Sequence, residues 1–270
     1  MEGTPGHGRK RKGRAGSTVI LIIAIVVLVI ALWRLIPLLL DYRQSQDTYQ
    51  DLQGEIVGLD PDSTDTSDEP WNAYDWASVT IDFNALWQIN PEVVGWIRFD
   101  DTDAVPVDYP IMYSGDNDKY LRTDLYGESH TSGSIFLEAA NSPDFTDIYN
   151  IIYGHNMRNG TMFGSLKQYK RDENFYDANP YFTIYTPLGA FRYAIFGYAD
   201  VKDDSDIYRV GFVPDQTYKQ QIDIMLASSD RNTGIVPTVD QQTVTLSTCT
   251  STGDNYRFVV YGVCVENKLY

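Results

Sequence analysis

Apolar residues form one long run near the start of the chain. The run covers Thr18–Trp33, and Leu35–Leu40 resumes it after Arg34. Together the two stretches approach the ~20 residues that a helix needs to span a bilayer. We therefore expect a transmembrane anchor at residues 18–40, preceded by a basic tail at residues 1–17.

The charges beside this run predict its orientation. The basic residues that precede it favour a cytoplasmic N-terminus, with the rest of the chain outside the cell membrane. A cleaved signal peptide is the rival interpretation. The run is longer than a typical signal core, and no clean small-x-small site follows it. We favour an uncleaved, single-pass anchor.

Residues 41–75 read as an extracellular stalk and linker. Asp41–Leu59 is polar with a weak helical pattern, and Asp60–Glu69 is acidic and rich in Ser and Thr. Such a composition is typical of a flexible connection. The folded domain is therefore expected at residues 76–270.

In the domain at 76–270, apolar residues follow two patterns, one with helical spacing and one with strand-like runs. Helical spacing predicts helices at Ile81–Ile89, Asn117–Tyr126, Met162–Tyr176 and Asp215–Ser228. Strand-like runs occupy Val93–Phe99, Val107–Met112, Gly133–Glu138, Ile148–Tyr153, Tyr181–Tyr185, Phe191–Val201, Gln242–Ser247 and Tyr256–Val265. The short spacing between strands predicts a mainly β fold, with mostly antiparallel pairing in a barrel-like sheet and helices inserted on it.

Composition narrows the function classes. The chain has 270 residues and a net charge of −16, and 43% of its residues are hydrophobic. The first 40 residues carry six basic side chains and one acid, so residues 41–270 carry −21. That acidity disfavours nucleic acid or anionic lipid as a partner of the domain. Two cysteines and three histidines argue against a disulfide framework and a structural zinc site.

A cysteine and an arginine stand at the ends of the last two predicted strands. Cys249 has polar neighbours, which argues against burial in the apolar core, whereas Cys264 lies in a core-like strand and reads as packing. A Cys249–Cys264 disulfide remains open. Arg257 offers a fixed cation for an oxyanion, although a surface salt bridge is a fair alternative for this residue taken alone. The pair suggests covalent acyl chemistry.

A thiol nucleophile needs a base, and His155 is the best placed of the three histidines. It follows the predicted strand that ends at Tyr153. His130 lies in a polar loop with no strand to direct it, and His7 is cytoplasmic in the expected topology. The protonation state of a Cys249–His155 pair is a coupled titration that the sequence leaves open.

These residues resemble a known family. Thr245-Leu246-Ser247-Thr248-Cys249 with Arg257 is similar to the TLxTC…R signature of sortases, the cysteine transpeptidases of Gram-positive cell surfaces. Further stretches resemble class B sortases: Ile152–Met157, Gly160–Leu166, Ile81–Phe83 with Ile89–Ile97, Asp108–Ile111, Asn117–Leu121, and the helix at 215–228.

The resemblance implies an eight-stranded sortase-type β-barrel with N-terminal helices and an extra helix before the cysteine strand. It implies that Cys249 is the nucleophile, His155 the general acid and base, and Arg257 the group that holds substrate or oxyanion. Ser247 and the amide of Thr250 are implied substrate contacts. No metal or organic cofactor is needed for this chemistry.

The implied reaction cleaves a C-terminal sorting motif of a secreted protein after Thr, through a thioacyl-enzyme. The acyl group then passes to an amine, most simply one on cell-wall peptidoglycan. A pilin-polymerising sortase would use the same residues. A hydrolytic cysteine peptidase and a non-catalytic binding module are the other candidates.

Overall fold

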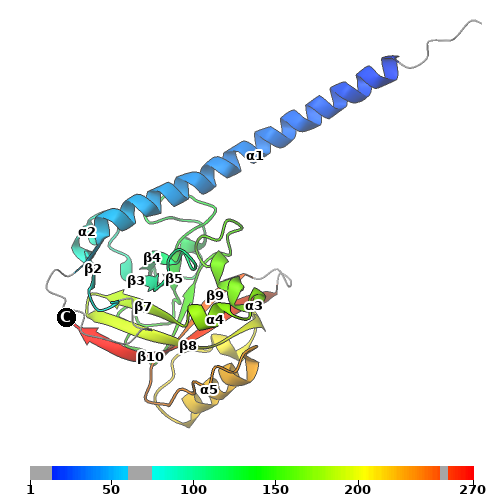
Figure 1. The fold of residues 1–270 in the computed structure, drawn as a ribbon. Helices are drawn as coiled ribbons and strands as arrows, with labels where there is room; N and C mark the ends of the chain where they lie inside the picture. The colour runs from blue at the N-terminus through cyan, green and yellow to red at the C-terminus, as the bar shows by residue number, and fades with distance from the viewer. Residues whose placement is uncertain (1–13, 60–74, 250–254) are drawn as a thin grey trace, which may run out of the picture. The chain divides into compact units, whose positions relative to one another are not determined.

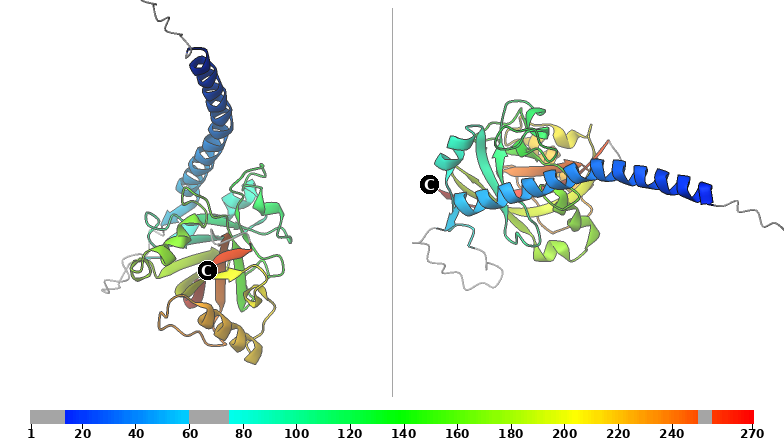
Figure 2. Two further views of the ribbon diagram at one scale, coloured as in Figure 1. Left: turned by 90° about the vertical axis from the view of Figure 1, so that its right-hand side faces the viewer. Right: turned by 90° about the horizontal axis from the view of Figure 1, so that it is seen from above.

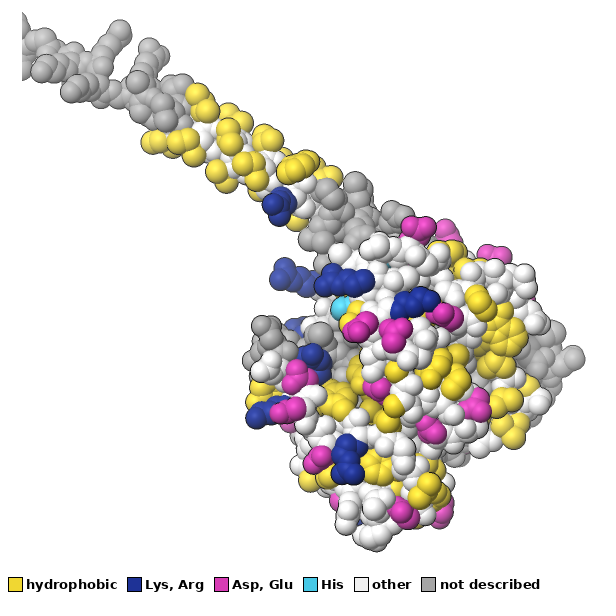
Figure 3. Space-filling model, turned by 180° about the vertical axis from the view of Figure 1, so that it is seen from behind, with side chains coloured by type: hydrophobic (Ala, Val, Ile, Leu, Met, Phe, Trp, Pro, Cys, Tyr) yellow, Lys and Arg dark blue, Asp and Glu magenta, His cyan; other side chains and the backbone are white. Residues whose placement is uncertain are grey.

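The computed structural model describes residues 14–59, 75–249 and 255–270, with the backbone alone at residues 14–19, 37–48 and 249. The chain divides into two compact units, which meet between Ser45 and Gln46. Helix α1 (Arg14–Ile56) begins in the first unit. Its large apolar side chains from Ile20 to Ile36 are exposed, and Figure 3 shows them gathered on the helix surface. Within the described residues, no helix offers an apolar stretch long enough to cross a membrane.

The second unit, Gln46–Tyr270, is built on a closed eight-stranded barrel (Figure 1). Around the barrel the strands run β10-β8-β7-β3-β4-β5-β6-β9. Strand β10 closes the barrel, because it pairs with β8 on one side and β9 on the other. Their bounds are β3 (Val93–Phe99), β4 (Asp108–Met112), β5 (Ile135–Leu137), β6 (Tyr149–Tyr153), β7 (Tyr181–Thr186), β8 (Gly189–Lys202), β9 (Thr243–Cys249) and β10 (Tyr256–Leu269). The predicted eight-stranded barrel is confirmed.

Pairing in the barrel is mixed. Six neighbouring pairs are antiparallel, but β4 pairs parallel with β5 and β6 pairs parallel with β9. The sequence predicted mostly antiparallel pairs and did not distinguish these two. The parallel β6–β9 pair matters for function, because parallel neighbours present their carboxyl ends at the same edge of a sheet.

A small second sheet lies before the barrel. Strands β1 (Val57–Leu59) and β2 (Val79–Ile81) pair antiparallel, and helix α2 (Phe83–Ile89) follows. Asp82 caps α2 by accepting a hydrogen bond from the Ala85 amide. Aspartate is one of the residue types that are preferred at this N-cap position. Residues 46–59, which the sequence placed in the stalk, contribute the buried side chains Tyr49, Leu52 and Ile56 to this unit.

Helical structure departs from prediction in two places. The segment Asn117–Tyr126 forms only the single turn η1 (Lys119–Leu121). The predicted helix Met162–Tyr176 is three short pieces: η2 (Gly164–Lys167), α3 (Gln168–Arg171) and α4 (Phe175–Ala178). Met162 adopts a φ of 52°, which a helix cannot accommodate, so the apolar spacing there comes from tight turns and not from a continuous helix.

Helix α5 (Gln216–Ser228) confirms the extra helix predicted before the cysteine strand. Asp215 caps it, accepting from the Thr217 and Tyr218 amides. It lies outside the barrel against β8 in Figure 1, and the turned view of Figure 2 agrees. The turn η3 (Asp206–Tyr208) precedes it. Buried residues of α5, β6, β8 and β10 join in one cluster: Tyr218, Ile222, Met225, Tyr149, Ile151, Phe196, Val259, Tyr261 and Val263.

Candidate active site

Three neighbouring strands bring the predicted site residues to one level of the barrel. Tyr153 at the end of β6 is the register partner of Ser247 in β9, so His155 and Cys249 each follow two residues later. The Gly154 amide donates to the Ser247 carbonyl at 3.1 Å, which continues this ladder toward His155. On the other side, Arg257 is the register partner of Cys249 in the antiparallel β9–β10 pair.

Strand alternation places Tyr153 of β6 and Arg257 of β10 on the same face of the sheet. Tyr149 and Ile151 of β6 pack in the cluster under α5, and residues an even number apart along a strand share its face. The same holds on β10 for Val259 and Tyr261, two and four residues after Arg257. The site therefore sits on the α5 face, beyond the part of the sheet that α5 covers.

His155, Ser247 and Arg257 line one small cavity of about 100 Å³. The other described lining residues are Leu121, Phe136, Tyr153, Gly154 and Thr248. Cys249 belongs to the strand that supplies two of these walls, although its side chain lies outside the described residues. The structure thus gathers in one place the residues that the sequence identified separately.

The imidazole of His155 is held by backbone. Its Nε2 lies 2.8 Å from the carbonyl oxygen of Leu121, the last residue of η1. A carbonyl only accepts hydrogen bonds, so Nε2 is the protonated nitrogen. In the neutral ring the lone pair is therefore on Nδ1, and proton exchange falls to that atom.

Arg257 lines the same cavity from strand β10. Its Nη1 donates to the Tyr256 carbonyl at 3.0 Å, and its Nη2 is 3.7 Å from Oδ2 of Asp203. The side chain is 30% exposed. A pair this long and this exposed contributes little to stability, so the salt bridge with Asp203 does not by itself explain the placement of Arg257.

Ser247 is buried and hydrogen bonded. Its hydroxyl lies 2.9 Å from the Tyr208 hydroxyl, which ties η3 to strand β9 at the cavity. Thr250, the other expected substrate contact, lies outside the described residues.

Tyr153 joins the cavity to a carboxylate. Its hydroxyl donates to Oε2 of Glu138 at 2.7 Å. Burial, reinforced by this carboxylate, raises the pKa of Tyr153 well above its usual value. The phenol therefore stays neutral, and the ring of Tyr153 stacks against that of Tyr208 at a centroid distance of 6.3 Å.

The two alternatives considered from sequence lie elsewhere. Nδ1 of His130 is bound to the Ser132 hydroxyl at 2.7 Å, and His130 is absent from the described cavity wall. Cys264 is a free thiol facing Tyr193 of β8, so the Cys249–Cys264 disulfide is not formed. Burial raises the pKa of the Cys264 thiol to about 11, which suits a packing residue.

Sequence reasoning missed Leu121, Tyr208 and Asp203. Each acts from a loop or a single turn, through a backbone carbonyl, a phenol and a carboxylate respectively. No local pattern marks such residues before the loops are placed. In the described part of the chain, no group of three His, Cys, Asp or Glu side chains is arranged to hold a metal ion.

Comparison with known proteins places the chain in a family. Residues 101–265 match the sortase domain. Sortase B of Listeria monocytogenes is 32% identical over 182 residues, which is 67% of this chain and 72% of the relative. The structure of sortase B from Bacillus anthracis in complex with AAEK1 superposes with a TM-score of 0.69 at 29% identity, covering 84% of this chain and 99% of that one.

A Staphylococcus aureus sortase B–substrate complex is also similar, with a TM-score of 0.62 and 28% identity over 68% of this chain and 84% of that one. These similarities extend over most of the chain and cover its barrel fold. The chain belongs to the sortase family of cysteine transpeptidases and is of the sortase B class.

Proposed function

We propose that this enzyme cleaves a C-terminal sorting motif of secreted proteins after Thr and transfers the acyl group to an amine of cell-wall peptidoglycan. The observation that carries the proposal is that His155, two residues after β6, and Arg257 of β10 line one small cavity with Ser247 of β9, the strand that ends at Cys249. A cysteine strand that lies between a histidine and an arginine suits acyl transfer through a covalent intermediate.

In the first step the Cys249 thiol gives its proton to Nδ1 of His155, and its sulfur attacks the carbonyl carbon of the motif's Thr. An S–C bond forms while the peptide C–N bond breaks. Nδ1 of His155 delivers a proton to the departing nitrogen. This role is supported by the Leu121 carbonyl, which occupies Nε2 and leaves Nδ1 to exchange the proton. The products are a thioacyl-enzyme and a released C-terminal fragment.

In the second step the amine attacks the thioester. His155 accepts the proton that the amine loses, and the C–S bond breaks to return the cysteine. Arg257 stabilises the oxyanion of both tetrahedral intermediates, since a guanidinium stays charged and presents fixed N–H groups. Ser247 and the amide of Thr250 would contact the motif. All bonds and protons balance without a metal or an organic cofactor.

The site of action is also part of the proposal. We assign residues 18–40 to a membrane anchor, with the tail 1–17 in the cytoplasm, the stalk at 41–75 and the catalytic domain at 76–270 outside. Support comes from the apolar run in the sequence and from the exposed apolar side chains of α1 between Ile20 and Ile36. Protease treatment of intact cells should remove the domain and spare the tail.

The test uses the full-length protein in detergent micelles with a library of sorting-motif peptides. Cleavage after Thr with a trapped thioacyl mass on Cys249, and transfer to an added cell-wall amine, are expected. Cys249→Ala should abolish both. Cleavage by that variant would refute the mechanism.

The alternatives give different products. Transfer to a pilin lysine in preference to a peptidoglycan amine would identify a pilin-polymerising enzyme. Hydrolysis alone, even at high amine concentration, would identify a peptidase of surface proteins.

A further inference from the structure

The last two turns of helix α1 pack against the barrel. Leu52 and Ile56 are each 2% exposed, and Tyr49 is 5% exposed. These three residues recur at helical spacing, so they form one buried face of the helix. The end of α1 is therefore part of the catalytic unit in its packing, although its sequence reads as a stalk.

Two contacts join this end of α1 to the start of strand β4. The rings of Tyr49 and Tyr109 meet edge to face, with their centroids 5.2 Å apart and an angle of 88° between their planes. Aromatic pairs favour this geometry. Nε2 of Gln53, one turn after Tyr49, donates to the Asp108 carbonyl at 2.6 Å. Consecutive residues of β4 are therefore both held by α1.

Tyr109 in turn supports the turn that follows the catalytic histidine. Its hydroxyl accepts a hydrogen bond from the Met162 amide at 3.4 Å. Met162 has a φ of 52°, a left-handed conformation that is uncommon for a residue with a side chain. Such a conformation persists only where the surrounding structure holds it. The Tyr109 hydroxyl and the antiparallel bridge between Met162 and Asn156 are two of the contacts that do so.

The residue after Met162 contacts the catalytic histidine's own backbone. The Phe163 amide donates to the His155 carbonyl at 3.0 Å. A Cβ at Gly154 would lie 2.7 Å from the Phe163 ring, so this ring is packed against the residue before His155. A shift of Met162 would therefore move the backbone that carries the imidazole.

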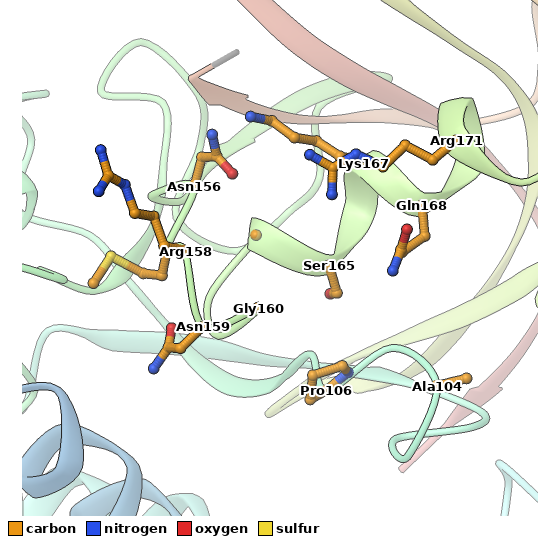
Figure 4. Close-up of a pocket in the computed structure, with 12 residues that line it drawn as sticks. Ala104, Pro106, Asn156, Arg158, Asn159, Gly160, Ser165, Lys167, Gln168 and Arg171 are labelled. Atoms are coloured by element: carbon orange, nitrogen blue, oxygen red, sulfur yellow. The ribbon is translucent and has the colours of Figure 1, made fainter. Parts of the chain in front are cut away.

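Shared cavities place the same segments side by side. Thr161, the residue before Met162, lines a cavity of about 220 Å³ together with Tyr49, Tyr109 and Pro106. Pro106 also lines a neighbouring pocket with Gly160, and Figure 4 shows both residues at its wall. The end of α1, the start of β4 and the turn after His155 are therefore neighbours in space as well as partners in a chain of contacts.

We propose that Tyr49 is a positioning residue for catalysis: its ring holds His155 in the reactive orientation through Tyr109 and Met162. The proposal rests on the transfer reaction proposed above, in which His155 exchanges the protons. A small displacement of a catalytic group lowers the rate strongly, so a residue outside the cavity can control the chemical step. The end of α1 then serves the reaction and not only the attachment of the domain.

The first experiment measures peptide cleavage by full-length protein in detergent micelles, well below the unfolding temperature. Tyr49→Ala removes the ring and should lower kcat about threefold to tenfold, with the peptide KM within about twofold of wild type. Tyr49→Phe should keep the wild-type kcat, because the ring stays and the Tyr49 hydroxyl makes no hydrogen bond within the described residues. Gln50→Ala, at the exposed next residue, is the matched control. A wild-type kcat in Tyr49→Ala, or equal losses in Tyr49→Ala and Tyr49→Phe, would overturn the proposal.

The Tyr109→Phe variant tests the route. It keeps the ring that Tyr49 contacts and removes the acceptor of the Met162 amide, so kcat should fall by a similar factor. The double variant Tyr49→Ala/Tyr109→Phe should be about as slow as the slower single variant, because both changes release the same segment. Losses that multiply in the double variant would show that the two residues act independently, which overturns the route through Tyr109.

A pH profile separates positioning from a loss of stability. The apparent pKa values of a coupled Cys–His pair depend on the distance between the two groups, so displacement of His155 in Tyr49→Ala should shift a limb of the kcat/KM profile by about half a pH unit or more. Partial unfolding would lower the whole profile without changing its shape. A lower unfolding temperature with the wild-type kcat and profile would show that Tyr49 serves only the fold.

Hydrogen exchange tests the same contacts without catalysis. Backbone amides of residues 154–164 should exchange at least about tenfold faster in Tyr49→Ala than in wild type or Tyr49→Phe, because the segment opens more often. Unchanged protection in Tyr49→Ala would overturn the proposal while the transferase stands. A wild-type protein that forms no thioacyl-enzyme would refute the proposed function, and the exchange rates would still decide whether α1 holds the turn after His155.

Discussion

The carbonyl oxygen of Leu121 lies 2.8 Å from Nε2 of His155, so a backbone atom of the turn η1 sets the orientation of the imidazole. That turn is anchored by its neighbours. The Tyr120 hydroxyl and the Lys119 ammonium both donate to the Glu92 carboxylate, at 2.5 Å and 2.6 Å. The position of η1, and through it the direction of Nδ1, depends on this small polar group.

Tyr120→Phe should therefore reduce catalysis from a distance. The variant loses a hydrogen bond to a carboxylate, which costs about 1.5–3 kcal/mol, and η1 gains freedom. We expect kcat to fall about threefold to tenfold with little change in peptide KM. Tyr126→Phe, at a neighbouring exposed tyrosine, is the matched control. A variant that is less stable but fully active would show that η1 does not position His155.

Variants of Arg257 and Asp203 distinguish whether Arg257 stabilises an oxyanion or only forms a salt bridge. If Arg257 stabilises the oxyanion, Arg257→Lys should lower kcat/KM about 100-fold, because the fixed fork of donors is lost. Asp203→Asn removes the exposed partner at 3.7 Å and should change stability by less than about 1 kcal/mol. Steady-state cleavage of a motif peptide measures both. Comparable losses in the two variants would favour the structural role.

Gly154 is expected to tolerate no side chain. A Cβ there would lie 2.4 Å from Cδ1 of Ile135 and 2.7 Å from Cδ2 of Phe163. Gly154→Ala should cost about 1–3 kcal/mol in the free energy of unfolding and move the adjoining His155, with a measurable loss of kcat. The control is Gly54→Ala in α1, where nothing lies within 4 Å and a gain of up to about 1 kcal/mol is expected. Denaturant melts of both variants check the prediction, and an unchanged stability for Gly154→Ala contradicts it.

Cys264 should be the unreactive thiol. Burial raises its pKa from 9.0 to about 11, so at pH 8 its thiolate fraction is about 100-fold lower than that of an ordinary cysteine. Iodoacetamide at pH 8 should therefore modify the proposed nucleophile Cys249 first, as peptide mass spectrometry would show. Preferential modification of Cys264 would contradict both assignments.

The same thiol makes stability depend on alkaline pH. The folded chain holds the Cys264 proton more tightly than the unfolded chain, so this contribution is complete below pH 9 and is lost as the pH rises toward 11. The free energy of unfolding should fall over that range by about 1–2 kcal/mol more in the wild type than in Cys264→Ala. Urea melts at pH 8.5 and 10.5 measure the difference, and parallel pH dependences would refute it.

The strands were predictable where burial was one-sided or complete. Val93–Phe99 was predicted and observed with the same bounds, because this short apolar run is buried along most of its length. Met162–Tyr176 misled because tight turns at Met162 and after Arg171 produce apolar spacing that imitates a helix. The parallel pairing of β6 with β9 joins residues far apart in the chain. Local periodicity predicts a strand but does not predict which distant strand it pairs with.

The site was predictable in part for the same reason. His155, Ser247 and Arg257 lie at strand ends, where position along the chain translates into position on the barrel. Leu121 and Tyr208 reach the cavity from η1 and η3, and their contacts exist only once those turns pack. The roles of the three catalytic candidates stay predictions that the variants above test.

Closure of the barrel by β10 has a consequence for the order of synthesis. Arg257 and its strand follow His155 and Cys249 in the chain, and β9 lies between β6 and β10 only after β10 has paired. A nascent chain that has already produced His155 and Cys249 still lacks the third wall of the cavity. The cavity around His155 is therefore completed only after β10 has been synthesised and has paired with β8 and β9, although both His155 and Cys249 precede that strand in the chain.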